Sequence, residues 1–287
     1  MALFPGFTRT AIDTGEVAIH TVHGGQGPPV LLLHGFPQTH VMWHKIAPVL
    51  AEHFTVVATD LRGYGDSGRP ASGPDHAAYS KRAMARDQAA VMRHLGFERF
   101  AIVGHDRGAR VAHRLALDHA AHVTKLAVLD IVPTAKVYAA MDAAVARKYW
   151  HWFFLTLPAD IPETLVRNSA DYFMTQFFRL DPPGTYTPEA QAEYRRCFVP
   201  MLPGACEDFR AGGSIDLEHD REDGGRPVTC PVLALWGTRG NVVPFFDVLA
   251  AWRERATTVD GRALAGGHSL PEEIPEETVV ALRSFLG

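Results

Sequence analysis

The segment best suited to carry chemistry is Gly104-His-Asp-Arg-Gly108, which directly follows the apolar run 100–103. A Gly-x-nucleophile-x-Gly turn between a strand and a helix forms a nucleophile elbow, which lifts the central side chain onto the C-terminal edge of the sheet. The two glycines are expected to let the backbone turn sharply. The central residue here is Asp106, where serine or cysteine is common. A carboxylate nucleophile can displace a leaving group from carbon and form an ester.

An elbow nucleophile needs a base, a group that orients the base, and an oxyanion hole. His268 follows the last predicted strand after Gly266-Gly267, and we predict that it is the base. The loop 236–241, a common place for the orienting acid, contains no carboxylate. We therefore predict that Asp130, at the end of the strand after the elbow, orients His268 and stabilises its imidazolium form. The alternative is that Asp130 caps the helix that follows.

Two backbone N–H groups are expected to form the oxyanion hole, that of Phe36 in an early loop and that of Arg107 directly after the nucleophile. Arg107 and Arg110 stand on the helix that begins at Asp106, where residues three or four apart share a face. We predict that both hold a substrate carboxylate, because arginine presents paired donors that match its geometry. A structural salt bridge is the alternative. The clamp indicates a small anionic substrate with a leaving group on the adjacent carbon.

Short apolar segments alternate with helical patterns around the elbow. The pattern predicts strands at 16–23, 30–33, 54–59, 100–103, 126–130, 228–236 and 257–264, and helices at 43–51, 81–95, 107–118, 246–255 and 276–285. Such alternation is typical of a mostly parallel sheet with right-handed crossovers. The segment 135–225 is instead helical, aromatic and interrupted by prolines, which predicts an inserted all-helical cap. With the elbow, this organisation resembles the α/β-hydrolase fold, with a core formed by 1–134 and 226–287.

The composition fits a globular enzyme without a polyanionic partner. The chain has 287 residues, of which 47% are hydrophobic and 21% charged, and its net charge of -4 gives no indication of nucleic acid or an anionic membrane as partner. It has neither a signal peptide pattern nor an apolar run near the ~20 residues of a membrane span. Cys197, Cys206 and Cys230 form no CxxC pair, which favours free thiols in the cytoplasm. We predict no cofactor and no metal.

Several motifs together resemble the haloacetate dehalogenases, including the fluoroacetate dehalogenases, over nearly the whole chain. They are His34-Gly-Phe-Pro-Gln-Thr-His40, Gly104-His-Asp-Arg-Gly-Ala-Arg110, Leu129-Asp-Ile-Val-Pro-Thr134, Tyr149-Trp-His-Trp152 and Gly266-Gly-His268. The resemblance implies that Asp106 attacks the α-carbon of the substrate and expels halide, giving an ester. It implies that His268, supported by Asp130, activates the water that cleaves this ester.

The resemblance also implies the binding roles. Arg107 and Arg110 would hold the substrate carboxylate, and His151 and Trp152 of the cap would donate hydrogen bonds to the departing halide. From the residues alone, the segment 149–154 is equally typical of an apolar helix that packs on the core. A small organohalide is the implied partner, and a homodimer is implied by the resemblance only.

The sequence departs from that family in the cap. The family usually completes its halide pocket with the tyrosine of a Cys-x-Asp-Tyr-Arg-Ala run, whereas this run is Cys206-Glu-Asp-Phe-Arg-Ala211. Phe209 therefore has no hydroxyl, and the mid-cap tryptophan of the family has no counterpart in 176–180. We expect Phe209 to line the pocket and chloro- or bromoacetate to be used better than fluoroacetate. The altered pocket could also leave room for larger 2-haloacids.

Two other functions are compatible with parts of this pattern. An epoxide hydrolase uses the same aspartate and ester, and protonates the epoxide with two cap tyrosines, for which the candidates are Tyr138, Tyr149, Tyr172, Tyr186 and Tyr194. The two arginines after the nucleophile argue against it, because an epoxide has no carboxylate. A ligand receptor without enzymatic activity is the third hypothesis. The complete set of nucleophile, base and orienting acid argues against that hypothesis.

Overall fold

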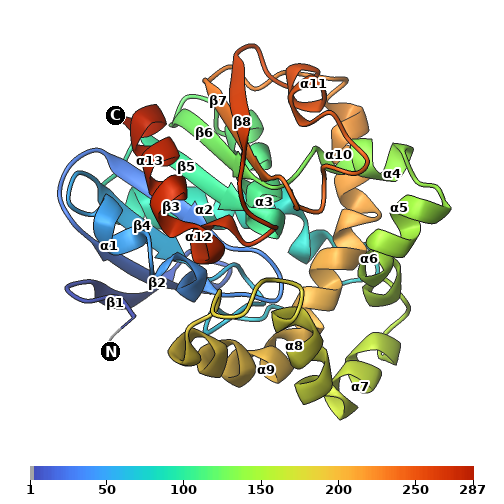
Figure 1. Cartoon of the computed structure of the whole chain (residues 1–287). Helices are drawn as coiled ribbons and strands as arrows, with labels where there is room; N and C mark the ends of the chain where they lie inside the picture. Colours follow the sequence, from blue (N-terminus) through green and yellow to red (C-terminus); the bar gives the residue numbers. More distant parts are fainter. Residues whose placement is uncertain (1–2) are drawn as a thin grey trace.

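The computed structural model describes residues 3–287. Within them, the strands form one eight-stranded sheet in the order β1-β2-β4-β3-β5-β6-β7-β8 (Figure 1). The antiparallel edge consists of β1 (Thr8–Asp13) and β2 (Ala18–Gly24), and β2 also runs antiparallel to β4. The remaining strands run parallel: β3 (Pro29–Leu33), β4 (Thr55–Thr59), β5 (Phe100–His105), β6 (Val123–Leu129), β7 (Val232–Gly237) and β8 (Val259–Leu264). The predicted, mostly parallel sheet is confirmed.

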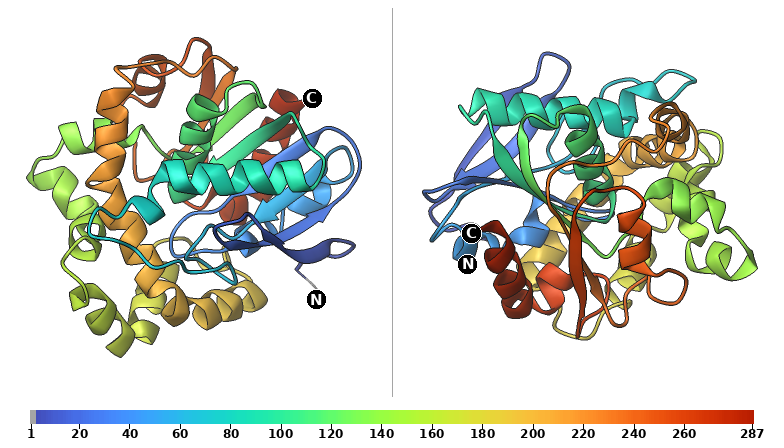
Figure 2. Two further views of the ribbon diagram at one scale, coloured as in Figure 1. Left: turned by 180° about the vertical axis from the view of Figure 1, so that it is seen from behind. Right: turned by 90° about the horizontal axis from the view of Figure 1, so that it is seen from above.

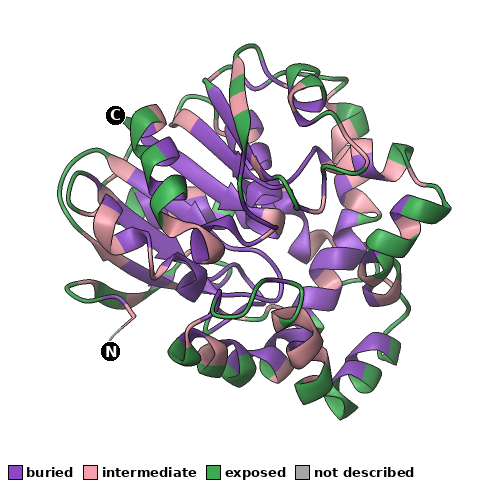
Figure 3. Cartoon of the chain, viewed as in Figure 1, coloured by how far each residue is buried: buried purple, intermediate pink, exposed green. Residues whose placement is uncertain are grey.

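Helices cover both faces of this sheet (Figure 2). α2 (Lys81–His94) packs beside α3 (Asp106–Asp118) on one face, and α13 (Pro275–Leu286) contacts α1 (Ala47–Leu50) on the other. α11 (Val248–Arg253) packs on β7 and β8. The central strands are apolar along their length and buried on both sides, as Figure 3 shows, which is typical of parallel strands between two helical layers.

One predicted helix is wrong in its extent. The segment 43–51 does not form a single helix: a 3₁₀-helix, η1 (His40–Trp43), is followed by the short α1, which begins at Ala47. Pro48 lies in the first turn of α1, where its missing N–H is tolerated. In the interior of a continuous helix the same residue would break the hydrogen-bond ladder. A second 3₁₀-helix, η2 (Ala77–Tyr79), precedes α2.

A helical segment lies between β6 and β7, where the sequence predicted an insertion. It consists of α4 (Thr134–Ala139), α5 (Ala143–Lys148), α6 (Trp150–Leu155), α7 (Ile161–Asn168), α8 (Ala170–Phe178), α9 (Pro188–Gly212) and α10 (Ile215–Glu222). Figures 1 and 2 show these helices gathered beside one end of the sheet. No helix in residues 3–287 combines the length and the apolar character that crossing a membrane requires.

Candidate active site

Asp106 stands at the tip of a sharp turn between β5 and α3. Its φ is 45°, in the left-handed region that non-glycine residues rarely adopt. A Cβ at Gly104 would lie 2.5 Å from the Cα of Ala109, and one at Gly108 would lie 2.4 Å from the carbonyl oxygen of His34. The two glycines are thus required for close packing, and the unusual torsion falls on Asp106 itself. The prediction that the two glycines are needed for the backbone torsion of the turn is therefore wrong, because they are needed for close packing.

The loop after β3 brings a backbone donor to the nucleophile. The N–H of Phe36 donates to Oδ2 of Asp106 over 3.1 Å. Buried His34 fixes this loop, because its Nε2 accepts from the N–H of Leu61 at 3.0 Å and its Nδ1 lies 2.8 Å from the carbonyl oxygen of Gly35. Burial lowers the pKa of His34, so the ring stays neutral and Nδ1 carries the donated proton. One of the two predicted oxyanion donors therefore contacts Asp106, the predicted nucleophile.

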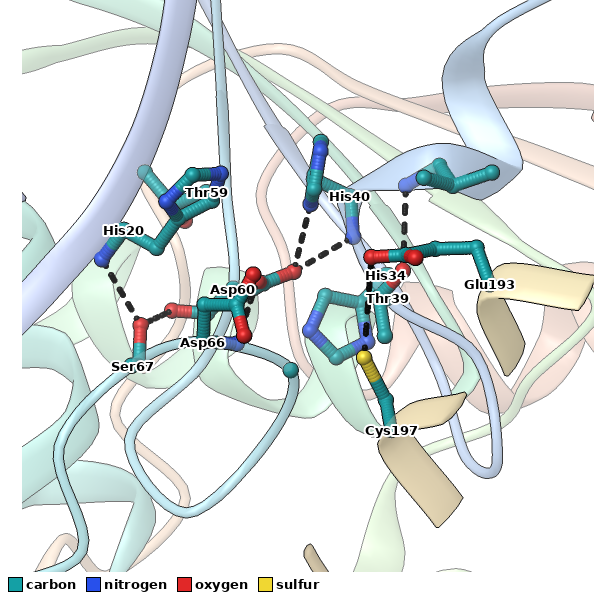
Figure 4. A network of polar contacts seen from close by, with 12 residues as sticks. His20, His34, Thr39, His40, Thr59, Asp60, Asp66, Ser67, Glu193 and Cys197 are labelled. Carbon is teal, nitrogen blue, oxygen red and sulfur yellow. Dashed lines mark hydrogen bonds and ion pairs between the residues drawn. The ribbon is translucent and has the colours of Figure 1, made fainter. Parts of the chain in front are cut away.

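A second network contacts the same loop at His40 (Figure 4). Oδ1 of Asp60 accepts from the backbone N–H of His40 at 2.7 Å and lies 2.8 Å from His40 Nδ1, and its Oδ2 accepts from the N–H of Asp66 at 3.0 Å. One potential metal-ligand atom from each of His20, His40 and Asp60 lies within 4.8 Å of the other two, a spacing that could hold a metal ion. Because the Asp60 oxygens are already engaged by N–H groups, we assign this cluster to positioning the loops after β3 and β4.

His268 and Asp130 form a hydrogen-bonded pair across 138 positions of sequence. Nδ1 of His268 lies 2.6 Å from Oδ2 of Asp130. The N–H groups of Gly237 and Asn241 donate to the Asp130 carboxylate at 3.2 and 3.0 Å, so the loop that lacks an acid supplies donors to it. Burial opposes a charged imidazole, but the bond to Asp130 outweighs it and raises the pKa of His268. Asp130 does not cap α4, whose N-cap is Pro133.

His105, to which the sequence analysis assigned no role, packs against His268, the predicted base. Its Nε2 lies 2.9 Å from the carbonyl oxygen of His268, and the two rings are 4.5 Å apart. Burial lowers the pKa of His105 to about 3, so the neutral ring donates from Nε2. Its Nδ1 is buried without a hydrogen-bond partner among residues 3–287. His105, which directly precedes Asp106, thereby fixes the loop that carries His268.

Arg110 faces the cavity in front of the nucleophile. Its Nη1 donates to the carbonyl oxygen of Val132 at 3.1 Å and to Oγ1 of Thr134 at 2.9 Å. Its guanidinium carbon lies 4.7 Å from the centroid of the Trp152 ring. Within the described part of the chain, its buried Nε has no hydrogen-bond partner. A buried guanidinium that lines a cavity is suited to bind an anion.

Arg107 points elsewhere. Its Nε and Nη2 donate to the carboxylate of Asp208, both at 2.8 Å, and Nη2 also donates to the Asp208 carbonyl oxygen at 2.7 Å. The same carboxylate accepts from Tyr64 Oη at 2.7 Å and from Lys81 Nζ. The Arg107 side chain is buried and is not part of the cavity wall formed by residues 3–287. Asp208 was missed from the sequence, where its only signal is its place in the run 206–211.

A cavity of about 370 Å³ lies in front of Asp106, between the carboxyl edge of the sheet and the helices α6 and α8. Its wall brings together Asp106, Arg110, Asp130, His268, His151 and Trp152. The whole wall consists of Phe36, Pro37, Asp106, Arg110, Asp130, Ile131, Tyr149, Trp150, His151, Trp152, Tyr172, Phe173, Gln176, Phe177, Leu180, Asn241 and His268. Six of the predicted site residues therefore share one cavity with the Phe36 loop.

His151 and Trp152, the two predicted halide ligands, both line the cavity, and the ring of Phe209 packs near both of them. Trp152 packs against the rings of Tyr138 and Tyr149, with centroids 5.5 and 5.2 Å away. Burial lowers the pKa of His151 to about 4, so it is neutral at pH 7 and keeps one N–H to donate. Phe209 was predicted to line the pocket, but it is buried outside the wall, with its ring centroid 6.0 Å from that of His151.

A buried carboxyl ties the catalytic loops to the inserted helices. Oε2 of Glu272 accepts from Gln38 Nε2 at 2.6 Å, and its Oε1 accepts from Tyr194 Oη at 3.0 Å. Glu272 belongs to α12 (Leu270–Glu273), directly after the base, whereas Gln38 follows the oxyanion loop and Tyr194 belongs to α9. Burial raises the pKa of Glu272 from its ordinary value of 4.5 to about 8.

This carboxyl predicts a pH-dependent loss of stability. Between pH 4.5 and 8 the folded state keeps the Glu272 proton that the unfolded state releases, so the free energy of unfolding should fall as the pH rises. The slope is at most about 1.4 kcal/mol per pH unit from this group. Urea unfolding at pH 6 and pH 8 measures it, and Glu272→Gln should have a flatter slope than the exposed control Glu277→Gln. Equal slopes in the two variants would contradict the assignment.

Comparison with known proteins agrees with this geometry. The alpha/beta hydrolase fold family model matches residues 28–273. A fluoroacetate dehalogenase from Burkholderia sp is 47% identical, covering 99% of this chain and 95% of that protein. A soluble epoxide hydrolase from Corynebacterium sp. (strain C12) is 35% identical, covering 93% of each. The crystal structure of an alpha/beta hydrolase from Nostoc sp PCC 7120 has 56% identity and a TM-score of 0.96 over 98% of each chain. The predicted fold class and the resemblance to the haloacetate dehalogenases are confirmed, and the chain belongs to the alpha/beta hydrolase fold family.

Proposed function

We propose that this protein is a hydrolase that cleaves the carbon–halogen bond of haloacetates and gives the hydroxy acid and halide. The observation that carries the proposal is one cavity whose wall contains the Asp106 carboxylate, the hydrogen-bonded pair of His268 and Asp130, and the buried side chain of Arg110. The 47% identity to a fluoroacetate dehalogenase supports it. No cofactor is part of the proposal, because each step uses only groups already in the wall and water.

In the first step, a carboxylate oxygen of Asp106 attacks the α-carbon, the carbon–halogen bond breaks, and halide leaves with the bonding electrons. Burial alone would raise the pKa of Asp106, but the charges of His268 and Arg110 outweigh it and hold this pKa below its usual range. The nucleophile is therefore ionised at neutral pH. Its Oδ2 is held by Phe36, which leaves the other oxygen for the attack.

In the second step, water cleaves the ester. The ester no longer carries the Asp106 charge that helps to keep His268 protonated, so His268 loses its proton to solvent and becomes a base. It then removes a proton from water, the hydroxide adds to the carbonyl carbon of the Asp106 ester, and negative charge develops on the oxygen that faces Phe36. The Phe36 N–H, together with the N–H of Arg107, would stabilise that charge. The bond from this carbon to the oxygen of the product then breaks and restores the Asp106 carboxyl. Asp130 stabilises the imidazolium of His268 until the proton passes to the leaving hydroxy acid or to water.

The substrate carboxylate is assigned first to Arg110, and the halide to His151 and Trp152. The hydrogen bonds of the Arg107 side chain within residues 3–287 use Nε and Nη2, so only Nη1 is left for the substrate carboxylate. Arg107 is therefore proposed as the weaker of the two carboxylate-binding arginines, since its side chain is not part of the cavity wall. The neutral ring of His151 and the indole of Trp152 both face the cavity and carry N–H donors. A departing halide needs such donors in a place that excludes water.

An epoxide hydrolase is the second candidate, supported by the relative from Corynebacterium. Of the predicted cap tyrosines, Tyr149 and Tyr172 line the cavity, whereas Tyr186 and Tyr194 bind buried carboxyls through their hydroxyls. The side chain of Tyr172 is 70% exposed, which makes it a weak proton donor to a buried epoxide. The buried charge of Arg110 also has no partner on an epoxide. These observations favour the haloacid.

The remaining assignments concern the setting of the enzyme. The helices α4–α10 are proposed as a cap, 135–225, on a core formed by 1–134 and 226–287. All three cysteines are free, which supports a reducing compartment such as the cytoplasm. A homodimer is proposed from the family resemblance alone.

Halide release from bromo-, chloro- and fluoroacetate at equal concentration tests the proposed function. Release with equimolar glycolate is expected, with chloro- or bromoacetate faster than fluoroacetate. Diol formation from simple epoxides without any halide release from haloacetates would support the second candidate and overturn the first.

Phe209 offers a test of the halogen preference. Its ring lies 4.2 Å from the guanidinium carbon of Arg107, and its centroid lies 6.0 and 6.4 Å from the rings of His151 and Trp152. A hydrogen bond to an anion is worth on the order of 1.5–3 kcal/mol, so Phe209→Tyr should raise the fluoroacetate rate by roughly ten- to a hundredfold. The rate with bromoacetate should change less, because bromide leaves more easily. Phe178→Tyr, which adds a hydroxyl to a ring that packs on Tyr186 and Tyr194, is the control; equal effects of the two variants would contradict the prediction.

A further inference from the structure

The cavity is larger than a haloacetate requires. Its volume of about 370 Å³ falls in the range of roughly 300–1,000 Å³ that is usual for drug-sized ligands. A haloacetate has only two carbons, one carboxylate and one halogen. The groups that the proposed reaction uses, among them Asp106, Arg110 and His151, account for one part of the wall. The rest of the wall has no role in the conversion of a haloacetate.

The α8 segment supplies five residues of this remaining wall, of which Gln176 is polar and the other four, Tyr172, Phe173, Phe177 and Leu180, are aromatic or aliphatic. The cavity residues from this segment recur three or four positions apart, in two adjacent rows on one helix face. Phe173 and Phe177 are half-buried and lie deeper. Tyr172 and Leu180 are 70% and 78% exposed and form the rim. This part of the wall therefore changes from an exposed rim to partly buried aromatic rings.

The two deeper rings are held in place by their neighbours. Phe173 stacks on Phe198, with centroids 5.3 Å apart and planes at 23°, and lies 6.4 Å from Phe36. Phe177 lies 5.5 Å from the ring of Tyr186, whose hydroxyl is bonded to Ser269 at 2.9 Å. Rings fixed in this way keep an apolar surface open to the cavity. A passage that served only for the entry of a small anion would not need such a surface.

The geometry of the displacement defines what can meet this surface. The α-carbon must face Asp106, with halide on the opposite side and the carboxylate toward Arg110. A tetrahedral carbon then has two further positions, which both carry hydrogen in a haloacetate. We propose, building on the proposed function, that the enzyme takes 2-haloacids whose α-carbon bears an apolar alkyl chain, and that Phe173 and Phe177 bind this chain. Each buried methylene should tighten binding roughly fourfold.

The chain-length dependence of bromide release tests the proposal. The single enantiomers of 2-bromopropionate and 2-bromohexanoate react at the same kind of secondary carbon and differ only in the length of the chain. For the faster enantiomer, kcat/KM should be about tenfold or more higher for 2-bromohexanoate. An equal or lower value would overturn the subsite. Failure to release bromide from bromoacetate would instead overturn the proposed function, so the two failures are distinguishable.

Variants locate the effect on α8. Phe177→Ala should bring the hexanoate-to-propionate ratio of kcat/KM close to one, while Phe177→Leu, which keeps apolar bulk, should retain most of it. Leu165→Ala, at an exposed position on α7 outside the cavity wall, should leave the ratio unchanged. A ratio in Phe177→Ala equal to that of the unchanged protein would overturn the assignment of the chain to this wall.

Discussion

Replacing His268 with alanine should stop the enzyme after a single halide per active site. The first step needs only Asp106 and the anion-binding groups, so halide should appear in a burst equal to the enzyme concentration. The second step loses its base, and steady turnover should fall by roughly 10³-fold or more. Intact-mass measurement should then find the chain heavier by one carboxymethyl group, located on Asp106. The pair of His268 with Asp130 and the absence of a second histidine side chain in bonding contact with that acid, among the described residues, motivate this expectation.

The control for this experiment is His94→Ala, at an exposed position near the end of α2. It should turn over many equivalents of halide and show no stable adduct. Steady turnover by His268→Ala without an adduct would contradict the role of His268 in ester cleavage.

Replacing Asp106 with asparagine should abolish halide release, with a loss of at least about 10⁴-fold, because an amide is a poor nucleophile toward carbon. Binding should survive, since Arg110, His151 and Trp152 remain in the wall. Chloroacetate should even bind more tightly to this variant, because the negative charge that repels the substrate carboxylate has been removed. Halide release and calorimetric titration with chloroacetate measure the two effects separately.

Asp171→Asn, on the exposed first turn of α8, is the matched control and should keep its activity. Asp106→Asn that loses chloroacetate binding together with turnover would point to a misfolded site, which circular dichroism and the unfolding midpoint detect. Asp106→Asn that keeps both binding and substantial turnover would contradict the role of Asp106 as nucleophile.

The parts of the site that follow from local sequence were predictable. The elbow needs only a strand, two glycines and a helix, and all of these can be read from 100–118. His268 and Asp130 follow from their positions after strands, because parallel strands end at one edge of a sheet. Their bond at 2.6 Å is the long-range consequence of that local order.

The direction of a long side chain could not be predicted in this way. Helical spacing placed Arg107 and Arg110 near the nucleophile, but it could not reveal that Asp208, 101 positions later, binds Arg107. A buried arginine needs a partner, and which carboxylate supplies it depends on how the inserted helices dock. The place of Phe209 behind the wall follows from the same docking, since its ring packs on the Arg107 guanidinium. Burial of Glu272 likewise depends on contacts from two distant segments, those of Gln38 and Tyr194.

The central claim is that Asp106 forms an ester with the substrate, and a single turnover of chloroacetate in oxygen-18 water tests it most directly. With enzyme in excess, the account predicts that glycolate from the first turnover carries unlabelled oxygen from Asp106, and that the peptide containing Asp106 gains the label. Labelled glycolate and an unlabelled Asp106 peptide would mean that water attacks the α-carbon directly, and would contradict the account.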